Sequence, residues 1–269
     1  MAEPQSVPKT KETRKRILAS AVLVSIAFWV IFFAPTVIYY AVVLFYIFMG
    51  LNDYTKLVQK KSFPVNRGVM IALGLAAPWA VQAGCEPVFL IGAIVLLFFA
   101  NSRAENIQQA FAGSAIAIFG MVWIAWLFSY IIPLRYADFG GAKWVFYAIS
   151  TVKLGDAGAY FIGKKFGRTP FIPHISPKKT WEGAWGQLVT TVVVSCLSRF
   201  YLPAAFHDLL ILGIVLGVMA QVGDCVESIV KRNLETKDSG VIPGLGGFLD
   251  ILDSLLLTIP LVYIYLSWL

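Results

Sequence analysis

The run LLILGIVLGVMAQVGDCVESIV, residues 209–230, is apolar for most of its length and carries two carboxylates, Asp224 and Glu227, near its end. A helix of this length matches the roughly 20 residues that a bilayer crossing requires. Similar runs recur along the whole chain, which is 58% hydrophobic and only 14% charged. Soluble domains contain fewer apolar and more charged residues. The sequence therefore predicts an integral membrane protein and excludes a soluble globule.

Nine apolar segments are separated by charged, glycine-containing or proline-containing loops. Long continuous runs are typical of helices, whereas a membrane β-barrel shows alternating segments of about ten residues. We therefore expect an all-α, polytopic membrane protein with about nine transmembrane helices. The expected spans are 17–34, 36–51, 68–84, 87–100, 110–132, 144–163, 184–202, 209–230 and 248–269. Residues 1–16 are a basic tail, residues 17–143 the N-terminal helices, and residues 144–269 the expected catalytic region.

The distribution of cations predicts the orientation. With the N-terminus in the cytoplasm, 18 of the 22 Lys and Arg residues fall on the cytoplasmic side, as the positive-inside rule requires. The net charge of +7 is then explained by basic loops that face anionic lipid, and it does not indicate nucleic-acid binding. The three cysteines, Cys85, Cys196 and Cys225, lack metal-ligand spacing, which argues against a disulfide framework or a zinc site.

Carboxylates inside the apolar segments are the strongest functional signal. Ten of the 15 acidic residues, Asp53 among them, fall in loops or at span ends. The other five are Asp156, Asp224, Glu227, Asp250 and Asp253. An ionised group at the bilayer centre costs about 2.5–3.5 kcal/mol, and Lys153 is the cation expected within a span. The negative charge is therefore under-compensated.

Helical spacing aligns these acids. Asp224 and Glu227 share a helix face with Lys231, and Asp250 and Asp253 share a face of the next span. Oxygen ligands without histidine or thiolate favour Mg²⁺ or Mn²⁺. The pattern predicts a cation site; helix-packing acids paired with lysines, and an ion or proton pathway, are the alternatives.

Two cytoplasmic loops have the chemistry of phosphate binding. Residues 237–250, KDSGVIPGLGGFLD, contain glycines that let backbone amides approach an anion, although a plain interhelical turn also uses glycines. In the loop 163–183, Ser176 followed by Pro177 is the pattern of a helix N-cap and first helical residue. This pattern predicts a helix N-terminus that presents Lys178, Lys179 and Thr180.

The stretch from Ser228 to Asp253, S-x2-K-R-x4-K-D-x-G-x-I-P-G-x-G-G-F-x-D-x2-D, closely resembles the signature of the phosphatidate cytidylyltransferase family. Residues 155–160, GDAGAY, and 175–183, ISPKKTWEG, are similar to further motifs of that family, in the same order. The resemblance covers about residues 144–260. Leu245 and Ile251 depart from it, since the family usually has His and Arg there.

The resemblance implies transfer of CMP from CTP to phosphatidic acid, giving CDP-diacylglycerol and pyrophosphate. We expect catalytic roles for Asp156, Asp224, Lys237, Asp250 and Asp253. The expected metal ligands are Asp224, Glu227, Asp250 and Asp253. The expected substrate-binding residues are Ser176, Lys178, Lys179, Thr180, Ser228, Lys231, Arg232, Gly244, Gly246 and Gly247. The expected cofactor is Mg²⁺ or Mn²⁺, with room for a second cation.

The expected partners are CTP, phosphatidic acid and the lipid bilayer, and a homodimer is the assembly we consider. We expect a bacterial-type inner membrane location, a site that faces the cytoplasm, and direct displacement without a covalent enzyme intermediate. Two alternatives remain. One is a related CTP-dependent lipid enzyme, either polyprenol kinase or CDP-archaeol synthase. The other is an ion-coupled transporter, which would distribute acids across the bilayer and often contain internal repeats.

Overall fold

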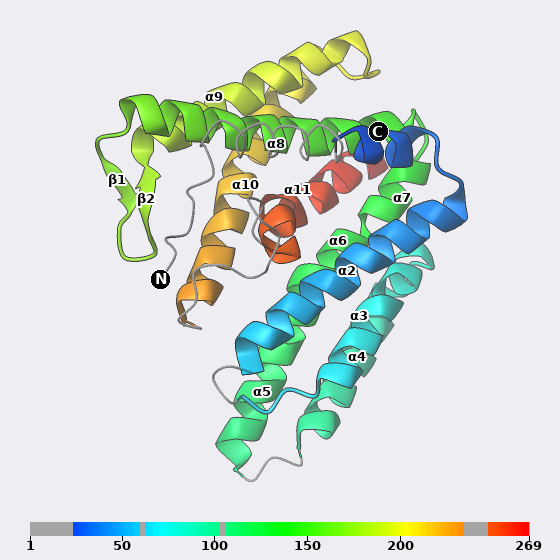
Figure 1. Cartoon of the computed structure of the whole chain (residues 1–269). Coiled ribbons are helices and arrows are strands. Elements are labelled where there is room, and N and C mark those ends of the chain that lie inside the picture. The colour runs from blue at the N-terminus through cyan, green and yellow to red at the C-terminus, as the bar shows by residue number, and fades with distance from the viewer. Residues whose placement is uncertain (1–23, 60–62, 103–105, 234–246, 269) are drawn as a thin grey trace, which may run out of the picture.

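The structure, a computed structural model, describes residues 24–59, 63–102, 106–233 and 247–268. Within this part of the chain, every predicted apolar segment contains a helix (Figure 1). The helices are residues 24–32, α2 (Thr36–Gln59), α3 (Arg67–Gln82), α4 (Glu86–Asn101), α5 (Ile107–Gly120), α6 (Leu127–Ser129), α7 (Ile131–Tyr136), α8 (Gly141–Phe166), α9 (Trp181–Leu197), α10 (Phe206–Asn233) and α11 (Phe248–Ser267). The expected basic tail, residues 1–16, lies outside the described residues.

In the part of the chain that the structure describes, four helical stretches are both long and apolar enough to cross a membrane. They are Thr36–Gln59, Ile107–Tyr136, Phe206–Asn233 and Phe248–Ser267. The second combines α5, α6 and α7 through a π-helical segment, Met121–Trp126. The predicted class, a helical membrane protein, is confirmed at this level.

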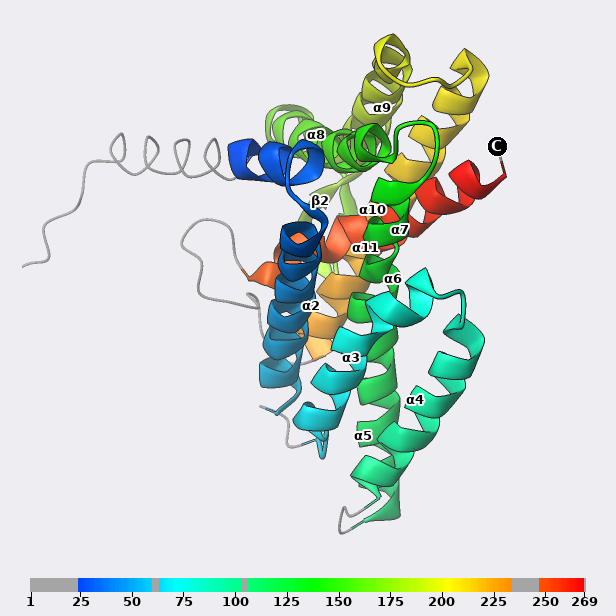
Figure 2. The same ribbon diagram turned by 90° about the vertical axis from the view of Figure 1, so that its right-hand side faces the viewer.

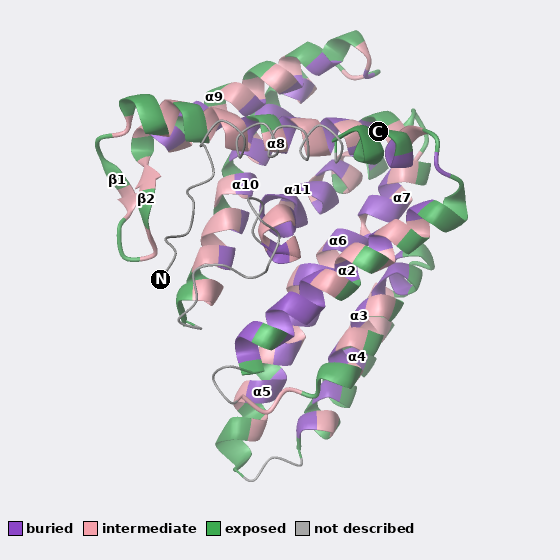
Figure 3. Ribbon diagram, viewed as in Figure 1, coloured by how far each residue is buried: buried purple, intermediate pink, exposed green. Residues whose placement is uncertain are grey.

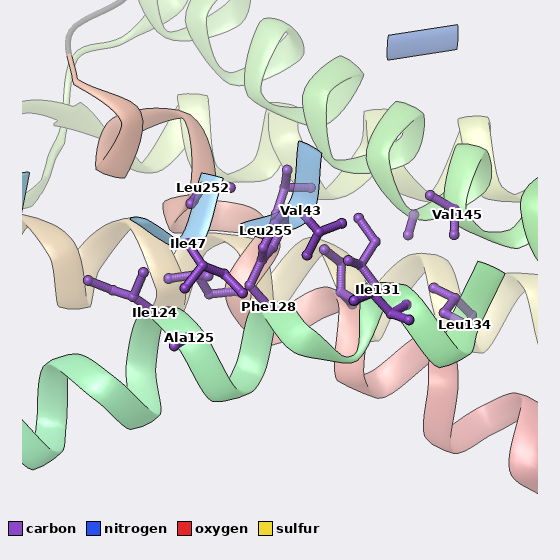
Figure 4. Packing of buried hydrophobic residues seen from close by; sticks show 14 of the residues in the cluster. Val43, Ile47, Ile124, Ala125, Phe128, Ile131, Leu134, Val145, Leu252 and Leu255 are labelled. Atoms are coloured by element: carbon purple, nitrogen blue, oxygen red, sulfur yellow. The ribbon is translucent and has the colours of Figure 1, made fainter. Parts of the chain in front are cut away.

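Helix α11 lies between two groups of helices. It contacts α10 and α8 on one side and α2 and α6 on the other, and Figures 1 and 2 show α8 lying across one end of the group formed by α2 to α5. Buried residues concentrate on α11 and on the second half of α2 (Figure 3). The core between α2, α6 and α11 includes Val43, Ile47, Phe128, Leu252 and Leu255 (Figure 4).

Helix α2 is longer than the span predicted for it. The expected span ended at residue 51, but the helix continues to Gln59 because Tyr54, Leu57 and Val58 extend its buried face. Asp53 therefore lies on a helix and not in a loop. Its side chain is buried inside the fold.

A two-stranded antiparallel sheet interrupts the otherwise helical fold. Strands β1 (Pro170–Ile172) and β2 (Ser176–Thr180) pair with Ile172 opposite Ser176. The predicted N-cap role of Ser176 is wrong, because residues 176–180 satisfy backbone groups by pairing with β1. The cap of α9 is Thr180 instead, whose hydroxyl accepts a hydrogen bond from the Gly183 amide at 3.2 Å.

Helices α10 and α11 approach each other backbone to backbone at Gly223. A Cβ atom at this position would lie 2.4 Å from the carbonyl oxygen of Asp253. No side chain fits there without moving α11. The missing side chain therefore lets Asp224, the next residue, lie beside α11.

We predict that Gly223→Ala lowers the free energy of unfolding by about 1–3 kcal/mol, the usual cost of forcing an extra carbon into a packed contact. Thermal unfolding of the purified protein in detergent measures this loss. Gly92→Ala is the matched control, because a methyl group on exposed Gly92 of α4 would meet no described atom within 4 Å. Equal melting temperatures for the two variants would contradict the prediction.

Candidate active site

Three carboxylates meet where α10 and α11 cross. Asp224 and Glu227 come from α10 and Asp253 from α11, and one oxygen of each lies within 4.8 Å of the other two. Glu227 is 2% exposed and Asp253 8% exposed. Among the described residues, Glu227 Oε1 has no hydrogen-bond partner. An all-oxygen set with an unsatisfied buried oxygen fits a hard divalent cation, so these three residues could hold a metal ion.

Asp250, an expected metal ligand, lies outside this group of three. Its Oδ1 accepts a hydrogen bond from Lys231 Nζ, and its Oδ2 accepts one from the Gly247 amide at 2.6 Å. Lys231 Nζ also lies 2.8 Å from Glu227 Oε2. Asp250 therefore caps the start of α11, and Lys231 pairs with two carboxylates at once.

Asp156 is the centre of a second polar cluster, which joins α8, α9 and α11. Its Oδ2 lies 3.3 Å from Lys153 Nζ and accepts a hydrogen bond from Ser254 Oγ at 3.0 Å. Its Oδ1 accepts a hydrogen bond from Gln187 Nε2 at 2.8 Å. The Ser254 amide in turn donates to Asp253 Oδ1 at 2.6 Å. Asp156 is thus linked through Ser254 to the group of three carboxylates.

A cavity of about 400 Å³ opens beside the carboxylates. Its walls come from α8, the β1–β2 hairpin, α9 and α10, and they include Lys178, Lys179, Thr180 and Asp224. Lys179 Nζ lies 2.8 Å from Asp224 Oδ2. This volume is typical of a small-molecule site. A phosphate-bearing molecule in the cavity would find the lysine side chains and Asp224, one of the three carboxylates, on its wall.

The hairpin is held in place by contacts at both of its ends. Arg232 Nε donates to the Ile175 carbonyl at 2.9 Å, and the Thr169 amide donates to Glu182 Oε1 at 3.2 Å. Hydrogen bonds from the amides of Glu182 itself, Arg168 and Thr169 hold the pKa of the Glu182 carboxyl below its usual range. Arg232, expected to bind substrate, therefore anchors a wall of the cavity.

Other predicted residues are placed less completely. Lys237, Gly244, Gly246 and the departure at Leu245 lie outside the described residues. Ser228 is half-buried on α10 directly after Glu227, and Ile251 is half-buried on α11. Ser176 begins β2 on the hairpin, so it is part of the same structure as Lys178 and Lys179.

One buried acid that contacts α11 was missed by the sequence analysis. Asp53 Oδ2 accepts a hydrogen bond from the Phe248 amide at 3.0 Å. Asp53 precedes the motifs that carry the family resemblance, so those motifs could not identify it. The apolar pattern through Tyr54, Leu57 and Val58 is the signal that could have placed Asp53 on a buried helix.

The helical fold, the group of three carboxylates and the lysine-lined cavity together define a helical membrane protein with a candidate site for an anionic ligand. The chain belongs to the cytidylyltransferase family, whose sequence profile matches residues 14–269. It is 40% identical over 149 residues to the phosphatidate cytidylyltransferase of Bacillus subtilis (strain 168), covering 54% of this chain and 55% of that protein.

Two further relatives bear the same name and align over more of their length. The phosphatidate cytidylyltransferase of Staphylococcus aureus (strain COL) is 32% identical over 74% of this chain and 78% of its own length. That of Mycobacterium bovis is 28% identical over 97% of this chain and 92% of its own length. The match thus spans about half of the B. subtilis protein and most of the mycobacterial one.

We predict that Lys231→Met lowers the free energy of unfolding by about 3–5 kcal/mol, because it leaves Glu227 and Asp250 without the cation that they share. Thermal unfolding in detergent without added divalent cation measures the loss. Lys178→Met is the control, since Lys178 is exposed on the hairpin. A Lys231→Met protein as stable as this control would show that the pairing contributes little.

Proposed function

We propose that this protein transfers CMP from CTP to phosphatidic acid and releases CDP-diacylglycerol and pyrophosphate. The observation that carries the proposal is the cavity lined by Lys178, Lys179 and Asp224, the last of which belongs to the group of three carboxylates. Membership of the cytidylyltransferase family and the names of its relatives support the same reaction.

In this reaction an oxygen of the lipid phosphate bonds to the α-phosphorus of CTP. At the same time the bond between the α-phosphorus and the oxygen that bridges it to the β-phosphorus breaks. The two electrons of the broken bond leave with pyrophosphate. Because the lipid phosphate is itself a nucleophile, the protein needs no covalent intermediate. Its contribution is to align the two phosphates and to stabilise the negative charge that develops on the leaving group. Lys178 and Lys179 would supply charge-assisted hydrogen bonds to phosphate oxygens.

We infer that Asp224, Glu227 and Asp253 hold Mg²⁺ or Mn²⁺. Glu227 Oε1, which has no hydrogen-bond partner in the described part of the chain, and the all-oxygen set support this assignment. Such an ion supplies positive charge for phosphate oxygens when it is bound. Asp156 would orient Asp253 through Ser254, because hydrogen bonds join the three residues in series.

We also propose nine bilayer crossings, a cytoplasmic N-terminus and a site that faces the cytoplasm of a bacterial-type inner membrane. Each of the nine predicted apolar segments contains a helix in the described part of the chain, which supports nine crossings. The orientation is supported by basic residues in the last turns of α8 and α10, both near the site: Lys164, Lys165, Lys231 and Arg232. Cations concentrate on the cytoplasmic side of membrane proteins. A homodimer stays a prediction.

The reaction is tested with purified protein, radiolabelled CTP, Mg²⁺ and phosphatidic acid. We expect a labelled lipid that comigrates with CDP-diacylglycerol, no product after EDTA treatment, and recovery when Mg²⁺ is restored. An archaeal ether-lipid phosphate is supplied in a parallel reaction, and polyprenol is supplied with CTP labelled in the γ-phosphate, the group that a kinase would transfer. Product formed with either of these but not with phosphatidic acid would reject the proposed substrate, and full activity in EDTA would reject the metal.

We predict that Asp253→Asn lowers kcat/KM by about two orders of magnitude or more, since a metal ligand acts on transition-state charge. Steady-state assays at saturating and limiting Mg²⁺ measure the effect. Asp138→Asn, at an exposed loop position between α7 and α8, is the control and should retain full activity. Near-normal turnover of a folded Asp253→Asn protein would remove Asp253 from the site.

A further inference from the structure

The carboxylate of Asp53 contacts the first residue of α11, although it comes from α2 and lies 195 positions away in the chain. Asp53 is only 6% exposed, and its Oδ2 is 3.0 Å from the Phe248 nitrogen. The rings of Phe45 and Tyr46, also from α2, pack against the Phe248 ring with centroids 5.4 and 5.8 Å apart. Helix α2 therefore contacts both the backbone and the side chain of Phe248.

Asp53, which belongs to α2, caps the start of α11 by accepting a hydrogen bond from its first amide. The first amides of a helix have no partner within it, and Gly247, which precedes α11, has no side chain to accept from them. Asp250 accepts from the Gly247 amide and Asp53 from the Phe248 amide. A carboxylate at this end of a helix also interacts favourably with the helix dipole.

The start of α11 decides where the catalytic carboxylates lie. Asp250 belongs to its first turn, and Asp253 follows one turn later, where its backbone already touches α10 at Gly223. A shift of the first turn of α11 would move Asp253 relative to Asp224 and Glu227, whose oxygens lie within 4.8 Å of it. The hydrogen bond from Phe248 to Asp53 thus helps to hold Asp253 in position relative to Asp224 and Glu227.

We propose that Asp53 is a positioning residue for the metal-binding carboxylates, and that the site is incomplete without α2. The effect of Asp53 on catalysis rests on the proposed function, whereas its effect on the position of α11 does not. A packing role alone would be served by an apolar side chain, without the cost of burying a carboxylate. The inference extends the site beyond residues 144–269, the region to which the sequence analysis assigned catalysis.

The chain offers a matched control in the preceding residue. Asn52 is also buried on α2, at 8% exposure, and its Oδ1 accepts a hydrogen bond from Arg67 Nη2 at 2.6 Å. This contact joins α2 to α3 and does not involve α11. Asn52→Ala therefore removes a buried polar contact of α2 while leaving the start of α11 in place.

The test compares Asp53→Ala, Asp53→Asn and Asn52→Ala as full-length purified proteins. Mn²⁺ affinity is measured by electron paramagnetic resonance without substrates, and hydrogen exchange is followed in peptides covering residues 247–256. We expect Asp53→Ala to weaken Mn²⁺ binding about 10–100-fold, the usual effect of losing a residue that orients ligands, and to speed exchange at the start of α11. Asp53→Asn keeps an acceptor oxygen, so it should retain most of the affinity.

Asn52→Ala should lower the melting temperature without changing Mn²⁺ affinity or exchange in these peptides. The proposal is overturned if Asp53→Ala leaves both quantities unchanged, if Asn52→Ala alters them equally, or if Asp53→Asn is as impaired as Asp53→Ala. Should Asp53→Ala fail to fold, Asp53→Leu, which fills the buried space without an acceptor oxygen, is compared with Asp53→Asn: equal Mn²⁺ affinity and equal exchange in these two variants overturn the proposal. Failure of the wild-type protein to label lipid would reject the proposed reaction, while the exchange measurement would still test the positioning role.

Discussion

The close crossing of α10 and α11 is the contact on which the site depends. Gly223 leaves room for the backbone of Asp253, because a Cβ atom would lie 2.4 Å from its carbonyl oxygen. This approach brings Asp224 and Glu227 of one helix to Asp253 of the other. Separately, each acid would be a costly charge in an apolar helix. Together they form an all-oxygen group of the kind that suits a hard divalent cation.

Charge compensation around the site is distributed over several elements. Lys153 pairs with Asp156 on α8, Lys231 of α10 is shared by Glu227 and Asp250, and Lys179 reaches Asp224 from the hairpin. The acids are therefore better compensated than the sequence analysis expected. Lys179 lines the cavity as well as pairing with Asp224. We infer that a phosphate bound there would pair with Lys179 and a cation with Asp224, in place of the contact between these two side chains.

Helix α11 connects the two halves of the molecule. It carries Asp250 and Asp253 toward α10, and on its other side it packs against α2 and α6. Asp53 adds a hydrogen bond to this apolar packing at the point where α11 begins. Because a rigid first turn is needed to keep ligands within reach of one cation, the N-terminal helices contribute to the site through α11.

Local properties of the sequence determined the class of protein, the positions of the helices and most of the candidate acids, because the length of an apolar run and the spacing of residues along a helix are set by near neighbours. Four features depended on the tertiary structure: the strand at Ser176, the pairing of Asp250 with Lys231, the contact of Lys179 with Asp224, and the burial of Asp53 against α11. Each requires a partner from another element, or from the far side of a turn, so no local pattern specifies it. Three-dimensional packing decided which predicted acids share one site and which ones hold it in place.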